Sequence, residues 1–243
     1  MADIALHPLA AQGEGIRRAP PVEARHVGAG EPVAGLPGGG PDAPVVAGVD
    51  QAFLDERAVS VVVAMQGGEV VERAHAVEPL AIPYVPGLLA FREGNPVLAA
   101  FDALEVTPDV VLFDGSGRIH YREAGLATHV GVVCDVPSVG VAKNLLCGTP
   151  DGSTAGLAAG ERVPVLADGE VSAPDGECIG YAVQTKQYDS PNRHVNPLYV
   201  SPGHRVGAAT AADLVLALSA GYKLPEPTRL ADAYADDVKA EYT

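Results

Sequence analysis

The segment Val45-Val46-Ala47-Gly48-Val49-Asp50 is an apolar run, rich in β-branched residues, that ends in an acid. Such runs, without polar alternation, are typical of strands that are buried on both faces of a sheet. Residues 58–65 predict a second strand, residues 66–68 a turn, and residues 69–77 a third strand. Three strands joined by short loops indicate an antiparallel meander.

Beyond the meander, helices alternate with apolar strands. Residues 86–93 predict a helix, and Asn95-Pro96 predicts the start of another that runs to about residue 104, because Asn is a good N-cap and Pro suits the first helical position. The segment Val110-Val111-Leu112-Phe113-Asp114 is a bounded apolar strand, and a glycine-rich loop follows it. We expect further helices at 126–134, 208–220 and from 228 onward, a strand at 138–142, a hairpin-like pair at 163–167 and 179–185, and a strand at 198–201. The predicted fold class is α/β: a mixed sheet, with an antiparallel three-strand meander plus parallel strands, flanked by helices.

The first 44 residues differ from the rest of the chain. The run Gly35-Leu36-Pro37-Gly38-Gly39-Gly40-Pro41 interrupts any helix or strand period. We therefore predict a flexible Gly/Pro-rich arm over residues 1–44 and one catalytic domain over residues 45–243, without internal repeats.

The composition excludes several classes of protein. Hydrophobic residues make up 47% of the 243 residues, which excludes wholesale disorder. No apolar run approaches the ~18 residues of a membrane span, and the start of the chain lacks a signal-peptide layout, so we expect a cytoplasmic protein. Three widely spaced cysteines exclude a disulfide scaffold and a CxxC zinc site.

The charge argues at first against a nucleic-acid partner. The chain has 31 acidic residues against 16 Lys and Arg, a formal charge of -15, and only four lysines. Phosphate contacts usually dominate nucleic-acid affinity. In a salt-saturated cytoplasm, however, the Debye length is about 3 Å or less, so the surplus charge repels DNA little at a distance. The composition fits such a halophilic protein, and the competing interpretation is an ordinary acidic protein.

Three acids occupy positions that solubility alone does not explain. Asp50 and Asp114 each close an apolar strand. Glu93 lies four residues from both Leu89 and Val97, on an apolar helical stripe where a carboxylate is costly unless it is paired or bound to a metal. Acids at the carboxyl ends of parallel strands lie where open α/β sheets form their sites, and an all-oxygen set suits Mg²⁺ or Mn²⁺. Alternatively, each acid only ends a strand or caps a helix.

The order of these elements is the plan of ribonuclease H-like nucleases, whose carboxylates hold one or two Mg²⁺ ions. Six short motifs, in order over about residues 46–234, further resemble endonuclease V, the deoxyinosine 3′ endonuclease. They are Pro83-Tyr84-Val85-Pro86-Gly87, Phe91-Arg92-Glu93, Phe113-Asp114-Gly115-Ser116-Gly117-Arg118-Ile119-His120, Val139-Gly140-Val141-Ala142-Lys143, Ser201-Pro202-Gly203-His204-Arg205 and Pro225-Glu226-Pro227-Thr228-Arg229.

The resemblance implies roles for five residues of the reaction site. Asp50 and Asp114 match the aspartates that bind the catalytic Mg²⁺, for which we expect Mn²⁺ to substitute. Glu93 would complete the acidic site through a water or a second metal. Lys143 matches a lysine close to the scissile phosphate, although it could also be a solvated strand end. His204 matches an active-site histidine that orients water or contacts phosphate.

The resemblance also implies DNA-binding residues. Pro83 and Pro86 would stiffen a strand-separating wedge, in which the Tyr84 ring replaces the stacking of a flipped base. Gly115, His120 and Gly125 lie in loops that resemble those enclosing the flipped base. There, backbone groups would distinguish hypoxanthine from adenine by the direction of hydrogen bonding.

Three features depart from the family pattern. Residues 1–44 lack the helix that many relatives carry, and His120-Tyr121-Arg122 stands where many have His-Pro-Arg. Residues 188–194 form an apparent insertion.

The expected function is that of a monomeric, Mg²⁺-dependent DNA repair endonuclease. It would cut the second phosphodiester 3′ to a deoxyinosine and leave a 3′-hydroxyl and a 5′-phosphate. The alternatives are cleavage of inosine-containing RNA, and a binding module with an inactive metal site. No membrane partner is expected.

Overall fold

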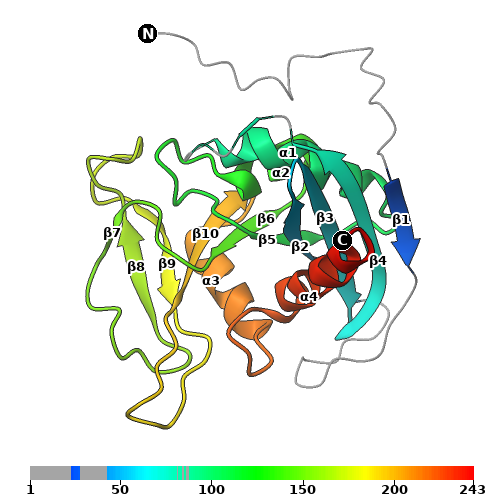
Figure 1. Cartoon of the computed structure of the whole chain (residues 1–243). Coiled ribbons are helices and arrows are strands. Elements are labelled where there is room, and N and C mark those ends of the chain that lie inside the picture. Colours follow the sequence, from blue (N-terminus) through cyan, green and yellow to red (C-terminus); the bar gives the residue numbers. More distant parts are fainter. Residues whose placement is uncertain (1–22, 28–42, 81, 84, 86–87) are drawn as a thin grey trace, which may run out of the picture.

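The computed structural model describes residues 23–27, 43–80, 82–83, 85 and 88–243, and over these residues it forms one mixed sheet flanked by helices (Figure 1). The ten described strands follow the order β1-β4-β3-β2-β5-β6-β10-β9-β8-β7. The strands are β1 Glu23–Val27, β2 Val45–Leu54, β3 Arg57–Gln66, β4 Glu69–Pro79, β5 Val110–Asp114, β6 Ser138–Ala142, β7 Thr149–Pro150, β8 Arg162–Leu166, β9 Cys178–Val183 and β10 Leu198–His204. The helices are α1 Leu89–Asp102, α2 Leu126–Cys134, α3 Ala208–Ala217 and α4 Glu226–Glu241.

The antiparallel and parallel parts of the sheet meet at β2. On one side, β2 pairs with β3, and β3 with β4, as an antiparallel meander. On the other side, β2, β5 and β6 are parallel, and β10 returns antiparallel to β6. The predicted mixed sheet is confirmed, as is the hairpin-like pairing of β8 with β9.

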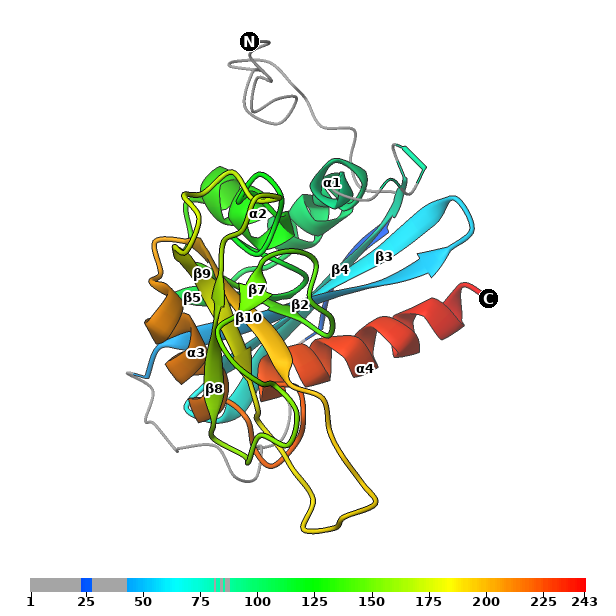
Figure 2. The same ribbon diagram turned by 90° about the vertical axis from the view of Figure 1, so that its left-hand side faces the viewer.

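Two pairs of helices cover opposite faces of this sheet, as Figure 2 shows. Apolar side chains of α1 and α2 pack on one face with Val49, Val111 and Phe113. On the other face, α4 packs against the meander, and α3 packs against β6 and β10 with Leu112. No helix among the described residues is long and apolar enough to span a membrane.

Three local expectations are wrong. The two helices expected between residues 86 and 104 are one helix, α1, which contains Pro96 in its interior. The apolar face that includes Ala90, Val97 and Ala100 packs into one core cluster, and this packing offsets the hydrogen bond that Pro96 cannot donate. Strand β2 does not end at Asp50 but continues to Leu54, because its outer half pairs with β3 up to Arg57.

The third difference concerns the predicted flexible arm. Within it, Glu23–Val27 forms β1 and pairs antiparallel with β4. These five residues are therefore an edge strand of the sheet, although their segment shows no clear strand period. Residues 1–22 and 28–42 lie outside the described residues.

Candidate active site

Asp50 and Asp114 come together because of the register of two parallel strands. The last residue pair between β2 and β5 joins Val49 to Phe113, and the two aspartates are the next residues of their strands. Beyond this pair, β2 continues only as the partner of β3, so the two strands diverge directly after the acids. The carboxylates therefore lie at the opening between the two strands.

Side-chain alternation directs both aspartates to the face covered by α4. Val49 and Phe113 pack under α1 and α2, so the next residue of each strand points to the other face. Gly48, on that same face, lets α4 approach: a Cβ at this position would lie 2.1 Å from the backbone carbonyl carbon of Pro227. The absence of a side chain at Gly48 thus lets the start of α4 approach β2, and this helix carries Asp232.

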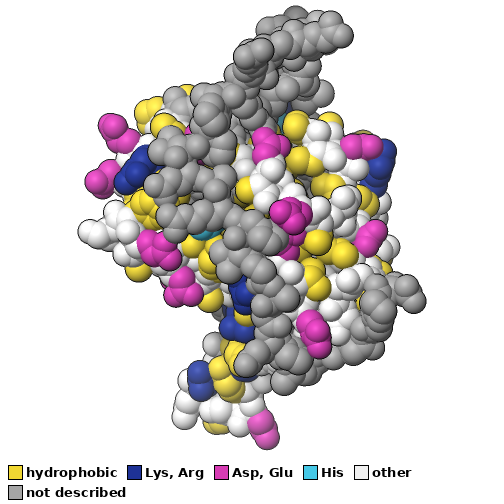
Figure 3. Space-filling model, turned by 90° about the vertical axis from the view of Figure 1, so that its right-hand side faces the viewer, with side chains coloured by type: hydrophobic (Ala, Val, Ile, Leu, Met, Phe, Trp, Pro, Cys, Tyr) yellow, Lys and Arg dark blue, Asp and Glu magenta, His cyan; other side chains and the backbone are white. Residues whose placement is uncertain are grey.

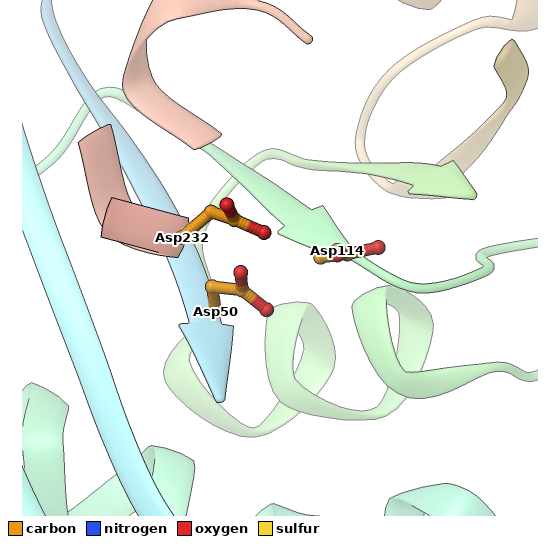
Figure 4. Close-up of side chains that lie close together, drawn as sticks. All are labelled: Asp50, Asp114 and Asp232. Atoms are coloured by element: carbon orange, nitrogen blue, oxygen red, sulfur yellow. The ribbon is translucent and has the colours of Figure 1, made fainter. Parts of the chain in front are cut away.

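The result is a cluster of three carboxylates, one from each of β2, β5 and α4. Asp50, Asp114 and Asp232 each offer an oxygen, and these atoms all lie within 4.8 Å of one another. Figure 4 shows the carboxyl groups of Asp50 and Asp232 converging beside Asp114. All three residues are partly exposed. Carboxylate oxygens at this spacing, open to solvent, fit a hard divalent cation such as Mg²⁺ or Mn²⁺.

Burial and a neighbouring like charge disfavour the charged form of Asp50 when no cation is bound. Burial, and next the negative charge of Asp114, raise the pKa of Asp50 from 3.8 to about 8. The backbone N–H of Gln51, which donates to Asp50 Oδ1 at 2.8 Å, only partly opposes this shift. The cluster is thus short of positive charge, which is the condition that a bound cation relieves.

Lys143 lies beside the cluster. Its Nζ is 2.8 Å from Asp114 Oδ2 and 3.3 Å from Asp232 Oδ1. Partial burial alone would lower the pKa of Lys143, but the hydrogen bond and charge of Asp114, with the charges of Asp232 and Asp50, raise it. The ammonium therefore stays charged at the edge of the acidic site.

Glu93 borders the cluster but is not one of its three members. It is buried on α1, and Arg92 Nη1 lies 3.2 Å from its Oε1. Burial raises the pKa of Glu93 to about 7; Arg92 lowers it, and the charge of Asp114 raises it. Gln51 links the two elements, because its Nε2 donates to the Glu93 carbonyl at 3.2 Å. Glu93 is therefore within electrostatic reach of Asp114.

The structure does not bring His204 to this cluster. On β10, His204 pairs with Ser138 at the start of β6, whereas Asp114 pairs with Val141 near the end of β6. Three residues of strand separate these levels, about 10 Å at ~3.3 Å per residue. The His204 ring instead faces Asp135, with Nε2 3.3 Å from Oδ1. His204 is thus not positioned to orient a water held by the aspartates.

The loop expected to enclose a base is compact and begins beside the cluster. Gly115 follows Asp114 directly, with φ of 157°, and its N–H donates to the Val141 carbonyl at 3.4 Å. Gly125 begins α2, and its N–H donates to the Gly117 carbonyl at 3.0 Å. A Cβ at Gly125 would lie 2.2 Å from the Ser116 carbonyl oxygen, so glycine permits this close approach.

Two further residues of the expected DNA contacts can be placed. His120 is buried, and its Nδ1 accepts from the Arg122 N–H at 3.2 Å, which holds the ring within the loop. Pro83 is exposed just before α1. Tyr84 and Pro86 lie outside the described residues, so the wedge stays a prediction.

Asp232 is the member of the site that the sequence interpretation missed. It lies in an acid-rich helix with Asp236 and Asp237, and nothing in the spacing of these acids separates the first from the others. The available signal was indirect: Asp232 follows Thr228 by one helical turn, and Thr228 belongs to a family-like motif. The contact between the first turn of α4 and Gly48 is what brings Asp232 close to Asp50.

Several known proteins are similar to this chain in sequence and in structure. A family model described as Endonuclease V matches residues 38–233. The endonuclease V of the halophilic archaeon Haloarcula marismortui is 67% identical over 199 residues, which span 81% of this chain and 73% of that protein. The crystal structure of endonuclease V from Streptomyces avermitilis aligns with a TM-score of 0.71 and 38% identity, over 85% of this chain and 86% of the other.

A third similar structure contains nucleic acid. It is the Ciona intestinalis endonuclease V in complex with a 24mer DNA that contains an inosine followed by a ribo-adenosine. The TM-score is 0.66 at 25% identity, and the alignment covers 83% of this chain and 88% of that one.

Proposed function

The chain belongs to the endonuclease V family, so it is a nuclease, and from this membership we propose that it is a DNA repair enzyme acting on deoxyinosine. The solved structures of the family share the ribonuclease H-like fold, which confirms the predicted fold class. The proposed reaction is hydrolysis of the second phosphodiester 3′ to the deaminated adenine, with a 3′-hydroxyl and a 5′-phosphate as products.

One observation carries this proposal: three aspartates from separate elements converge within 4.8 Å, with a charged lysine at their edge. A binding module with an inactive site has no need of such an arrangement, because three carboxylates beside a single lysine repel one another and destabilise a fold. The inosine-containing DNA bound by the Ciona relative supports the choice of lesion.

The three clustered aspartates, Lys143 and Glu93 would have different roles in this reaction. Asp50, Asp114 and Asp232 would hold Mg²⁺, with Mn²⁺ as a substitute; such an ion supplies charge that activates water and stabilises the leaving oxygen. Lys143 would offset the negative charge of the scissile phosphate from its place beside Asp114. Glu93, with a pKa of about 7, would hold the attacking water or accept its proton.

The loop from Gly115 to Gly125 would receive the extruded base. The loop begins directly after Asp114 and ends at α2. A base held there would therefore lie next to β5, the strand that ends at the carboxylate cluster. Its backbone groups can read the keto oxygen and protonated N1 of hypoxanthine, which present the opposite hydrogen-bonding pattern to adenine.

Cleavage of inosine-containing RNA is the second candidate. The Ciona complex, in which a ribo-adenosine follows the inosine, favours keeping RNA as a candidate substrate, since that relative accommodates a 2′-hydroxyl next to the lesion. A direct comparison separates the two candidates: matched deoxyinosine DNA and inosine RNA are incubated with the protein in molar KCl, with Mg²⁺ or with EDTA.

We expect Mg²⁺-dependent nicking of the DNA at a single position, the second bond 3′ to the lesion, and a product that DNA ligase can reseal. Faster cleavage of RNA would transfer the proposal to the RNA substrate. Equal cutting of undamaged strands would contradict recognition of inosine altogether.

The raised pKa values predict how stability depends on pH. Asp50 and Glu93 keep their protons in the metal-free fold up to about pH 8 and 7, but lose them near 3.8 and 4.5 when unfolded. The folded state therefore binds more protons across this window, so metal-free stability falls as the pH rises from about 4 to 8. Because a divalent cation competes with these protons, its stabilising effect should grow with pH.

Thermal unfolding with Mg²⁺ or EDTA at several pH values measures this effect. The rise in Tm on adding Mg²⁺ should be at least about twofold larger near pH 8.5 than near pH 5.5. The Asp50→Asn variant, which cannot titrate there, should lose most of the difference. A rise in Tm that is equal at all pH values would contradict a cation bound by these carboxylates.

A further inference from the structure

Basic side chains gather in one region of this acidic protein. Lys143, Lys186, Arg193, Lys223 and Arg229 include three of the four lysines of the chain and five of its 16 Lys and Arg residues. On the face drawn in Figure 3, dark-blue Lys and Arg side chains follow one another down the lower part of the molecule, with yellow side chains beside them. On a chain of charge -15, such a local group of cations is the place where a negatively charged partner is least repelled.

Two tyrosine rings lie among these cations. Arg193 lies 3.6 Å from the centroid of the Tyr188 ring, and Arg229 lies 4.7 Å from that of Tyr222. Lys186 lies over both rings, at 5.1 and 5.5 Å. The cations thereby bring the two rings to one place, and Tyr222 is 49% exposed. We call Lys186, Tyr188, Arg193, Tyr222, Lys223 and Arg229 the basic–aromatic surface.

The loop that carries Tyr188 and Arg193 is held closed at its base. Gln184 is buried, and its Nε2 donates to the carbonyls of Lys186 at 2.6 Å and Val195 at 2.7 Å. Gln187 Oε1 accepts from the N–H groups of Tyr188 at 3.0 Å and Val195 at 3.1 Å. This loop, which contains the insertion at 188–194, projects from the body at the bottom of Figure 2. Pinned ends reduce the entropy that a ligand must remove.

The surface borders the carboxylate cluster. Lys223 is held to the end of β9, because Thr185 Oγ1 donates to its carbonyl at 2.5 Å. Partial burial and the charge of Lys143 lower the pKa of Lys223, so its ammonium is within electrostatic reach of the active site. Arg229 forms an ion pair with Glu226, and both lie on α4 just before Asp232.

We propose that the basic–aromatic surface binds the cut strand of the nucleic acid on one side of the scissile phosphate. The lysines and arginines contact backbone phosphates, and the Tyr188 and Tyr222 rings stack on nucleotides that the enzyme has unpaired. The inference rests on the proposed function, since it extends the contacts of the same site. Stacking depends little on salt, whereas phosphate contacts weaken as counterions accumulate. A surface that combines stacking with phosphate contacts therefore keeps more of its affinity for DNA at high salt than phosphate contacts alone would.

Acidic residues cancel only part of this surface. Asp189 is exposed within the loop and Glu226 is paired with Arg229, so the four cations of the surface outnumber these two acids, and Asp232 faces the carboxylate cluster. A second copy of the acidic chain could also use a basic surface, so oligomeric state is measured alongside binding.

The test measures Kd for an inosine-containing duplex by fluorescence anisotropy, without divalent cation, over a series of KCl concentrations. In the Tyr188→Ala/Tyr222→Ala double variant, which removes two stacking rings, Kd should rise about 30-fold or more, with an unchanged salt dependence. In Arg193→Ala, the slope of log K against log salt should flatten by about one. Tyr188→Phe should bind like the wild type, because the ring is kept.

Arg57 and Tyr242 provide the matched control. Arg57 lies 5.9 Å from the Tyr242 ring centroid at the far end of α4, beside the exposed acids Asp55 and Glu56. Arg57→Ala and Tyr242→Ala should leave Kd and the salt dependence unchanged.

Duplexes shortened on either side of the inosine complete the design. The double variant and the wild type should bind equally to one of the two shortened duplexes, because that duplex lacks the nucleotides that the surface contacts. The inference is overturned if the surface variants bind every duplex like the controls, or if they change only the oligomeric state. If the surface variants lose affinity but the wild-type protein cleaves no inosine substrate, the inference about this surface stands and the proposed function is rejected.

Discussion

Replacing Asp114 with alanine is expected to abolish cleavage of an inosine-containing strand while binding of that strand survives. Asp114 offers one of the three clustered oxygens, and its Oδ2 lies 2.8 Å from Lys143 Nζ, so the substitution removes one proposed cation ligand and leaves Lys143 with Asp232 as its remaining acidic partner. Loss of both effects should lower the rate of the chemical step by about a thousandfold or more. Single-turnover cleavage at saturating protein measures that step apart from binding.

The fold should tolerate Asp114→Ala. Asp114 is the last residue of β5 and is partly exposed, and its removal relieves the like-charge repulsion that raises the pKa of Asp50. We therefore expect metal-free Tm to stay level or to rise. Asp109→Asn, at the opposite end of β5, is the matched control: it removes an exposed carboxylate that accepts from the Val45 N–H. Undiminished cleavage by Asp114→Ala would overturn the assignment of the site.

The sequence predicted the parts of this site that depend on local pattern. Asp50 and Asp114 could be recognised because each follows an apolar strand, and parallel strands bring such positions together without further information. Lys143 follows a third strand in the same way, and it lies where the pattern indicated. The predicted end of β2 was wrong, but Asp50 still lies where the two parallel strands separate, since their pairing ends at Val49 and Phe113 while β2 continues beside β3.

The parts that failed depend on contacts between distant segments. Asp232 reaches the site because the first turn of α4 packs on Gly48, about 180 residues earlier in the chain, and no local period reports such an approach. His204 lies in a motif near the end of an apolar strand, as Lys143 does. Its strand, however, runs antiparallel to β6, so the end of β10 lies at the wrong edge of the sheet. Strand direction is a tertiary property that a short apolar run does not encode.

The distribution of charge is more informative than its sum. Three of the acids converge as the proposed cation site, whereas two of the four lysines lie on the basic–aromatic surface and a third, Lys143, borders the three aspartates. The net charge of -15 therefore says little about nucleic-acid binding, since contact is made where the local sign is reversed. The halophilic relative at 67% identity is consistent with a salty working environment, in which distant charges are screened.

The second large effect is a contrast between two residues, Asp232 and His204. Asp232→Asn keeps the size of the side chain but weakens one of the three cation ligands, so we expect the single-turnover rate to fall by about a hundredfold or more. His204→Ala should leave that rate within about threefold of wild type. The ring nitrogen Nε2 of His204 pairs with the exposed Asp135, and loss of such a pair costs about 1 kcal/mol or less.

The same helix supplies the control for this contrast. Asp237→Asn removes an exposed carboxylate of α4 without touching the cluster, so it should cleave like the wild type. Increasing Mg²⁺ should partly restore Asp232→Asn, because a weakened ligand raises the cation concentration required, but it should not affect His204→Ala. If His204→Ala instead lost activity and Asp232→Asn kept it, the catalytic histidine implied by the family motif would be correct. The position of α4 over Gly48 would then have only a structural role.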